Sequence, residues 1–123
     1  MALPPVTDYK DLEAWKVGRR LVREVYLATR ALPQDERFGL IAQMRAAAVS
    51  IPSNIAEGYG RGTRQEYIRF LRIARGSAAE LETQVILCQD LGHLPPDLPM
   101  TRTVTMCRQL LNALLRSLHP PKQ

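Results

Sequence analysis

The strongest constraint on the fold is an apolar seam in the middle of the 123-residue chain. Side chains that are apolar or small recur there at alternating spacings of four and three: Tyr67, Leu71, Ala74, Ala78, Leu81, Val85 and Cys88. Heptad spacing puts these residues along one side of an α-helix, so the pattern predicts lengthwise packing against other helices. Thr63 and Glu66 have the spacing of a capping box, which predicts that the helix starts there.

Three further segments show helical periodicity. They are residues 11–32, a segment that starts between Asp35 and Leu40 and reaches Gly58, and a segment from about Asp97 to Leu118. Short connections between helices force neighbours to be antiparallel. We therefore predict an all-α fold, an antiparallel up-down-up-down four-helix bundle. A single domain over residues 11–119 is expected, with an N-terminal arm at 1–10 and a C-terminal tail at 120–123.

Several residues predict how the helices begin, bend and end. Asp11 is the expected N-cap of the first helix, and Pro33 is expected to end it. Pro52 lies inside the second helical pattern, where it removes a backbone hydrogen bond and predicts a kink. The second helix is expected to stop at Gly58, Gly60 and Gly62, and the third helix at Gly92.

A second stripe runs beside the seam of the third helix. Its members are Phe70, Ile73, Ser77, Glu80, Gln84, Leu87 and Leu91, so it is apolar at both ends and polar in the middle. A monomeric bundle needs one buried stripe per helix, so the surplus favours a contact with another subunit. A thickly buried central helix is the alternative. We also predict that Asn54, Glu57, Ser77 and Glu80 form a polar layer that fixes helix register or a subunit contact.

The chain has a net charge of +5, with fourteen arginines and three lysines. Such a balance favours polyanionic partners, although solubility alone is an equally simple explanation. The candidate nucleic-acid-binding residues are Lys16, Arg19, Arg20, Arg23, Arg30, Arg61, Arg64, Arg69 and Arg72. Their expected role is to neutralise phosphates, not to read bases. Few aromatic residues are interleaved with them, so the sequence does not indicate stacking of single strands.

Catalytic and metal-binding patterns are not found. The two histidines, His93 and His119, have no partner at a useful spacing, and two distant cysteines on apolar stripes indicate reduced core thiols. We therefore predict no catalytic residue, metal, cofactor or small-molecule substrate. The chain lacks a long apolar run and a secretory signal, so we expect a cytoplasmic protein without a membrane partner.

Specific motifs identify a resemblance. The most distinctive are Ser50-Ile-Pro-Ser-Asn-Ile-Ala-Glu-Gly58 and Ala74-Arg-Gly-Ser77. They are accompanied by Asp11-Leu12-x-x-Trp15, Gly39-Leu40, Gln43, Arg45, Arg61, Phe70-Leu71, Ile73, Glu80-Leu-Glu82 and Leu91-Gly92. Together they resemble the bacterial four-helix bundle proteins first met as products of intervening sequences in 23S rRNA genes. The likeness covers about residues 9–118.

This resemblance implies a small cytosolic bundle that assembles as a homopentamer around a central channel. It also implies kinship with the basic accessory proteins of diversity-generating retroelements, which bind a reverse transcriptase and nucleic acid. No catalytic residue is carried over. Our leading hypothesis is a non-enzymatic oligomer that binds RNA or a nucleic-acid-handling protein, such as a reverse-transcriptase-like protein. The alternative is a structural or scaffold protein that makes no contact with nucleic acid.

Overall fold

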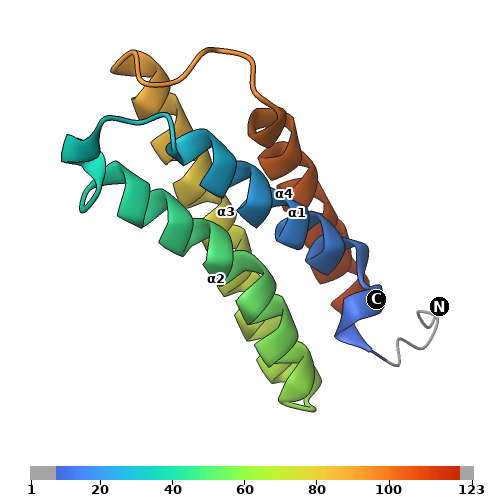
Figure 1. Cartoon of the computed structure of the whole chain (residues 1–123). Coiled ribbons are helices and arrows are strands. Elements are labelled where there is room, and N and C mark those ends of the chain that lie inside the picture. The colour runs from blue at the N-terminus through green and yellow to red at the C-terminus, as the bar shows by residue number, and fades with distance from the viewer. Residues whose placement is uncertain (1–7, 120–123) are drawn as a thin grey trace.

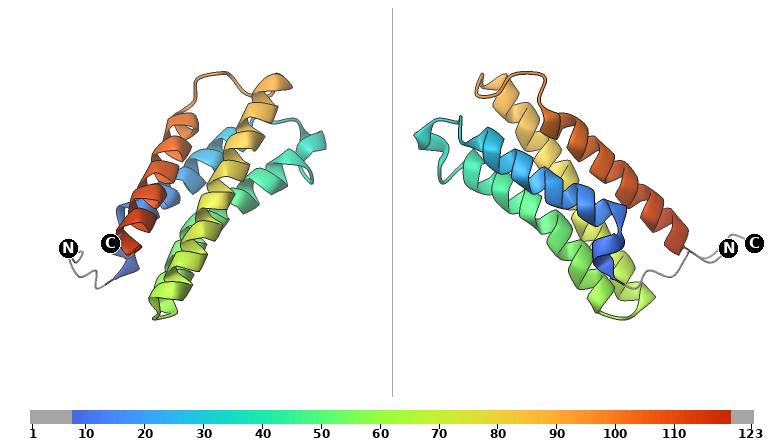
Figure 2. Two further views of the ribbon diagram at one scale, coloured as in Figure 1. Left: turned by 180° about the vertical axis from the view of Figure 1, so that it is seen from behind. Right: turned by 45° about the vertical axis from the view of Figure 1, so that its right-hand side comes forward.

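Four α-helices arranged antiparallel make up the fold, which confirms the predicted up-down bundle (Figure 1). The computed structural model describes residues 8–119. Its helices are α1 (Glu13–Thr29), α2 (Leu40–Gly60), α3 (Arg64–Asp90) and α4 (Pro99–Leu118), with short 3₁₀ helices η1 (Tyr9–Asp11) and η2 (Gln34–Glu36). Each α-helix packs against two others. Among the described residues no Cα atom of α1 lies within 8 Å of one in α3, so the two helices lie diagonally across the bundle (Figure 2).

The core is built from the predicted stripes. Every member of the α3 seam is buried except Tyr67, which is half-buried. The largest fully buried side chains on the other helices are Leu21 and Val25, Met44, Ile51 and Ile55, and Met100, Val104 and Leu111. Both cysteines are buried free thiols, and burial raises the pKa of the Cys107 thiol to about 12. The interpretation of both cysteines as core residues is therefore confirmed.

Two glycines permit close approaches between helices. A Cβ atom added at Gly18 of α1 would lie 3.3 Å from the Cγ2 of Ile51, next to Pro52 of α2. A Cβ atom added at Gly58 of α2 would lie 2.6 Å from the Cβ of Phe70 on α3. Gly58 is thus required by the packing of α2 on α3, because any larger residue would overlap with the facing helix.

The ends of the helices differ from the predictions at two places. Asp11 does not cap α1: Asp8 caps η1, and Leu12 precedes α1 without a side-chain cap. Gly58 does not stop α2, which continues to Gly60. Packing stabilises the helix at Gly58, where propensity alone would end it.

The other expected stops and starts agree with the structure. α2 ends at Gly60, and Gly62 beyond it has a positive φ of 84°. The start of the fourth helix near Asp97 is confirmed, since α4 begins at Pro99 with the proline in its first turn.

Other boundary predictions are confirmed. The Thr63 hydroxyl accepts a hydrogen bond from the backbone N–H of Glu66 at 3.2 Å, which caps the start of α3. Gly92 has φ of 77°, and the backbone N–H of His93 donates to the carbonyl of Cys88 at 2.8 Å, which closes the end of α3. Pro52 lies inside α2, and Figure 1 shows this helix changing direction near its middle. The expected arm and tail fall mainly on residues 1–7 and 120–123, outside the described residues.

Replacing Gly58 by Ala should destabilise the protein by about 1–3 kcal/mol, because the new methyl group overlaps Phe70. Denaturant unfolding measures this change. Gly60→Ala is the matched control: it lies in the same helix, and a Cβ there meets nothing within 4 Å. An equal effect of both substitutions would contradict the close approach.

Candidate nucleic-acid interface

The first group of candidate cations lies on the outer face of α1. Lys16, Arg19, Arg20, Arg23 and Arg30 are all exposed. Lys16 lies 3.5 Å from Glu13, an exposed pair that contributes little stability. Arg20 lies 3.8 Å from Glu24, whose side chain is half-buried. The Arg19 guanidinium lies over the Trp15 ring, 5.6 Å from its centroid. Within residues 8–119, Arg23 and Arg30 have no ion pair or hydrogen bond, so their charges remain available.

The second group surrounds the turn between α2 and α3. Here most cations already have partners. Arg61 pairs with Glu57 at 2.7 Å, Arg69 pairs with Glu66 at 2.7 Å, and Arg64 donates to the backbone carbonyl of Leu118 at the end of α4. The hydrogen bond from Arg69 lowers the pKa of the Glu66 carboxyl. The contacts with carboxylates make this group a weaker site for phosphates than α1.

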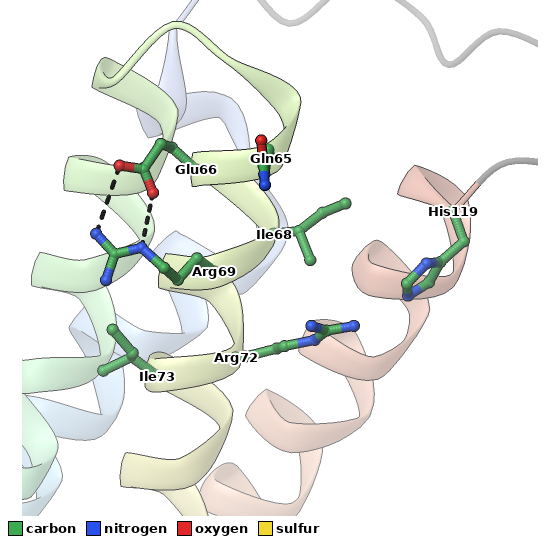
Figure 3. Close-up of a pocket in the computed structure, with 7 residues that line it drawn as sticks. All are labelled: Gln65, Glu66, Ile68, Arg69, Arg72, Ile73 and His119. Carbon is green, nitrogen blue, oxygen red and sulfur yellow. Dashed lines mark hydrogen bonds and ion pairs between the residues drawn. The ribbon is translucent and has the colours of Figure 1, made fainter.

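Arg72 is the exception in the second group. It has no ion pair or hydrogen bond with any residue between 8 and 119, and it projects from α3 toward the end of α4 (Figure 3). It lines a shallow surface hollow of about 920 Å³ that also includes Gln65, Ile68 and His119. This hollow therefore has one unneutralised guanidinium group.

The structure does not bring the two groups of cations onto one surface. α1 and α3 are diagonal to each other, so their outer faces point in different directions (Figure 2). Arg64 and Lys16 come from the same end of the bundle, because η1 and α1 begin beside the turn between α2 and α3. The nine predicted cations thus form two groups on different sides of one protomer, which come near each other only at the end of the bundle where η1 lies beside α2.

The predicted polar layer is only partly assembled in one protomer. The hydroxyls of Ser50 and Ser77 lie 2.8 Å apart, across the contact between α2 and α3. Asn54 donates through Nδ2 to the Ser50 hydroxyl and carbonyl, each at 2.8 Å. Glu57 instead pairs with Arg61, and Glu80 is exposed with no ion pair or hydrogen bond among the described residues. Ser50 is the connecting residue, and it was not among the predicted layer residues.

The second stripe of α3 is covered at one end and exposed at the other. Phe70 is 7% exposed. It packs on Gly58, and the guanidinium groups of Arg61 and Arg69 lie over its ring, 4.9 and 4.4 Å from the ring centroid. Gln84 is buried too. In the protomer, however, Ile73, Leu87 and Leu91 are 41%, 45% and 59% exposed. The stripe therefore leaves apolar surface uncovered on the outer side of α3.

An aromatic cluster at the end of the bundle was missed by sequence reasoning. Tyr9 of η1 contacts Trp15 of α1 and Tyr59 of α2, with ring centroids 5.5 and 6.4 Å apart, and Tyr59 contacts Tyr67 of α3 at 5.8 Å. Burial in this cluster raises the pKa of Tyr67 to about 12. The sequence held one signal of this cluster: Tyr59 and Tyr67 are the same number of residues before and after Thr63, and they therefore face each other across the turn.

Residues 8–119 contain no metal cluster and no membrane-spanning helix. No group of three or more His, Cys, Asp or Glu side chains is placed to hold a metal ion. No helix in this part of the chain is long and apolar enough to cross a membrane. His93 lies 3.5 Å from Glu36, where it links the loops before α2 and after α3.

The fold and its surfaces define a small antiparallel four-helix bundle protein with a basic outer face on its first helix. A model of the 23S rRNA-intervening sequence protein family matches residues 10–114, and the chain belongs to that family. A comparison with curated proteins found no match. The fold is similar to a crystal structure from Bacteroides thetaiotaomicron, described as a protein of unknown function from the S23 ribosomal protein family. The two are 22% identical with a TM-score of 0.75, and the match covers 84% of this chain and 95% of the other.

The contacts in the polar layer predict unequal effects of substitution. Ser77→Ala should lower the free energy of unfolding by about 1 kcal/mol, because it removes a half-buried hydrogen bond to Ser50. Glu57→Ala should change it by less than about 0.5 kcal/mol, because the pair with Arg61 is exposed. Urea unfolding of both variants measures the difference, and a larger loss for Glu57→Ala would contradict this assignment.

Proposed function

We propose that this protein is a non-enzymatic homo-oligomeric bundle that binds RNA, or a protein that handles nucleic acid, through basic surface residues. The outer face of α1 supports this most. It carries five cations against the carboxylates of Glu13 and Glu24, and Arg23 and Arg30 have no acidic partner in residues 8–119. Unneutralised arginines on an exposed helix suit contacts with the phosphates of a polyanion, which release counterions.

The exposed part of the second stripe supports self-association. Ile73, Leu87 and Leu91 project from a helix that already buries its seam within the protomer. Gly76 lies in the same exposed region, and a Cβ there would meet nothing within 4 Å. A glycine in the middle of a helix is destabilising, so an exposed one suits close approach by another backbone. A second copy of the chain is the proposed occupant, and the number of subunits, five by family resemblance, stays a prediction.

The two proposed surfaces are compatible because they lie on different sides. An oligomer built through the exposed stripe of α3 would leave the outer face of α1 open to solvent, because the two helices are diagonal in the bundle. Repetition of this face around an oligomer would present several basic helices to one RNA. Such multivalency raises the overall affinity without any additional contact per subunit.

The partners of the cations around the turn between α2 and α3 favour the scaffold alternative. Arg61, Arg64 and Arg69 are held by Glu57, Leu118 and Glu66 within the protomer. Cations with such partners are typical of solvated protein surfaces and do not require a polyanion. A protein whose basic side chains serve only solubility would bind no RNA at low salt.

Charge should be introduced into the exposed stripe to test self-association. Light scattering should find a wild-type particle several times heavier than the 13.9 kDa chain, and Leu87→Glu combined with Leu91→Glu should reduce it to a folded monomer. Both positions are exposed in the protomer, so the variant should keep its helical content. Leu27→Glu on α1, 54% exposed, is the control and should keep the oligomer. A monomeric wild type would refute the proposal.

Removal of the two unpaired charges on α1 tests the contact with RNA. Arg23→Gln combined with Arg30→Gln should weaken binding of a 23S rRNA fragment and reduce the salt slope by about two, one per lost phosphate contact. Arg102→Gln is the control, because Arg102 is an exposed arginine of α4 that pairs with Asp97 at 2.7 Å. Absence of wild-type binding at low salt would favour the scaffold.

A further inference from the structure

Four of the seven aromatic residues of the chain meet at one end of the bundle. Tyr9, Trp15, Tyr59 and Tyr67 come from η1, α1, α2 and α3, so the tertiary fold alone brings them together. All four are half-buried: they rest on the core but retain surface that reaches solvent. Because the rings are half-buried, part of their aromatic surface is open to contact by a ligand.

The cluster has a surface hollow on each side. One, of about 380 Å³, lies between α1 and α2 and is lined by Tyr9, Trp15 and Arg19. The other, of about 500 Å³, lies beside the turn after α2 and is lined by Tyr59, Tyr67 and Arg64. Both are within the range of roughly 300–1,000 Å³ that is usual for ligand clefts. Each hollow therefore combines aromatic surface with one arginine.

Positive charge surrounds the rings. The Lys10 ammonium lies over the Tyr9 ring at 5.9 Å, and the Arg19 guanidinium lies over the Trp15 ring at 5.6 Å. Lys10 also lies 4.0 Å from Asp8, so its charge is partly neutralised. Arg19 has no ion pair among residues 8–119. Aromatic rings with adjacent cations are the combination that binds single-stranded nucleic acid, because bases stack on the rings while phosphates contact the cations.

We infer that this end of the bundle binds unpaired nucleotides of RNA, with bases stacked on Tyr9, Trp15, Tyr59 and Tyr67. Phosphates are contacted by Arg19 and by the Arg64 N–H groups that do not donate to the Leu118 carbonyl, a neutral partner that leaves the charge of Arg64 in place. The inference rests on the proposed RNA binding and specifies which part of the RNA is held here. A duplex keeps its bases stacked inside and offers only its backbone, whereas loops and ends offer base faces. RNA with an unpaired segment should therefore bind more tightly than a continuous duplex.

The single tryptophan of the chain makes the site directly observable. A short oligouridine should quench Trp15 fluorescence in the full-length protein on binding, and a duplex of equal length should do so much less. Tyr59→Leu should weaken oligouridine binding about tenfold, the loss expected when one stacking ring is removed. Tyr59→Phe keeps the ring and should bind within about threefold of the wild type. Circular dichroism confirms that each variant is folded.

Tyr26→Leu is the matched control. Tyr26 is an exposed tyrosine near the other end of α1, where it lies against Arg45, and its loss should not change oligouridine binding. Equal affinity for oligouridine and duplex, together with unchanged binding by Tyr59→Leu, would overturn this inference. Salt-dependent duplex binding that is lost in Arg23→Gln with Arg30→Gln would still support the proposed function. No binding of either RNA at low salt would overturn both.

Discussion

Close packing of α2 against α3 determines where every candidate surface of this protein lies. At Gly58 the two helices approach so closely that an added Cβ atom would overlap Phe70. Farther along the same contact, the hydroxyl oxygens of Ser50 and Ser77 lie 2.8 Å apart. These two contacts fix the rotation of each helix about its axis. Once the rotations are fixed, the seam of α3 points to the core, and Leu87 and Leu91 point outward.

The same packing accounts for the distribution of charge around the turn. Because α2 continues through Gly58 to Gly60, Arg61 follows directly at its end and reaches both Glu57 and the ring of Phe70. The Arg69 guanidinium also lies over that ring. These guanidinium groups shield an aromatic residue that would otherwise be exposed, so their interactions are mainly intramolecular. The cations of α1 make fewer intramolecular contacts, and the proposed RNA contact therefore rests mainly on them.

The proposed surfaces divide the bundle by function. The outer side of α3 is apolar at its ends, the outer face of α1 is basic, and the end beside the turn after α2 is aromatic. An antiparallel bundle separates such surfaces naturally, since each helix shows solvent only the strip that its two neighbours leave uncovered. A small domain can thereby combine self-association with contacts to a polyanion.

The sequence by itself determined the number of helices, their antiparallel order and the core stripes, because heptad and 3.6-residue periodicity are properties of a single helix. It also indicated the surplus stripe of α3 and the cations of both groups. Only the tertiary structure decided that these cations form two surfaces, that Ser50 joins Asn54 to Ser77, and that Tyr9, Trp15, Tyr59 and Tyr67 meet. Which side chains of different helices come into contact depends on how closely the helices approach and on how each is rotated about its axis. Contacts between residues far apart in the chain determine this distance and this rotation, so no local sequence pattern predicts them.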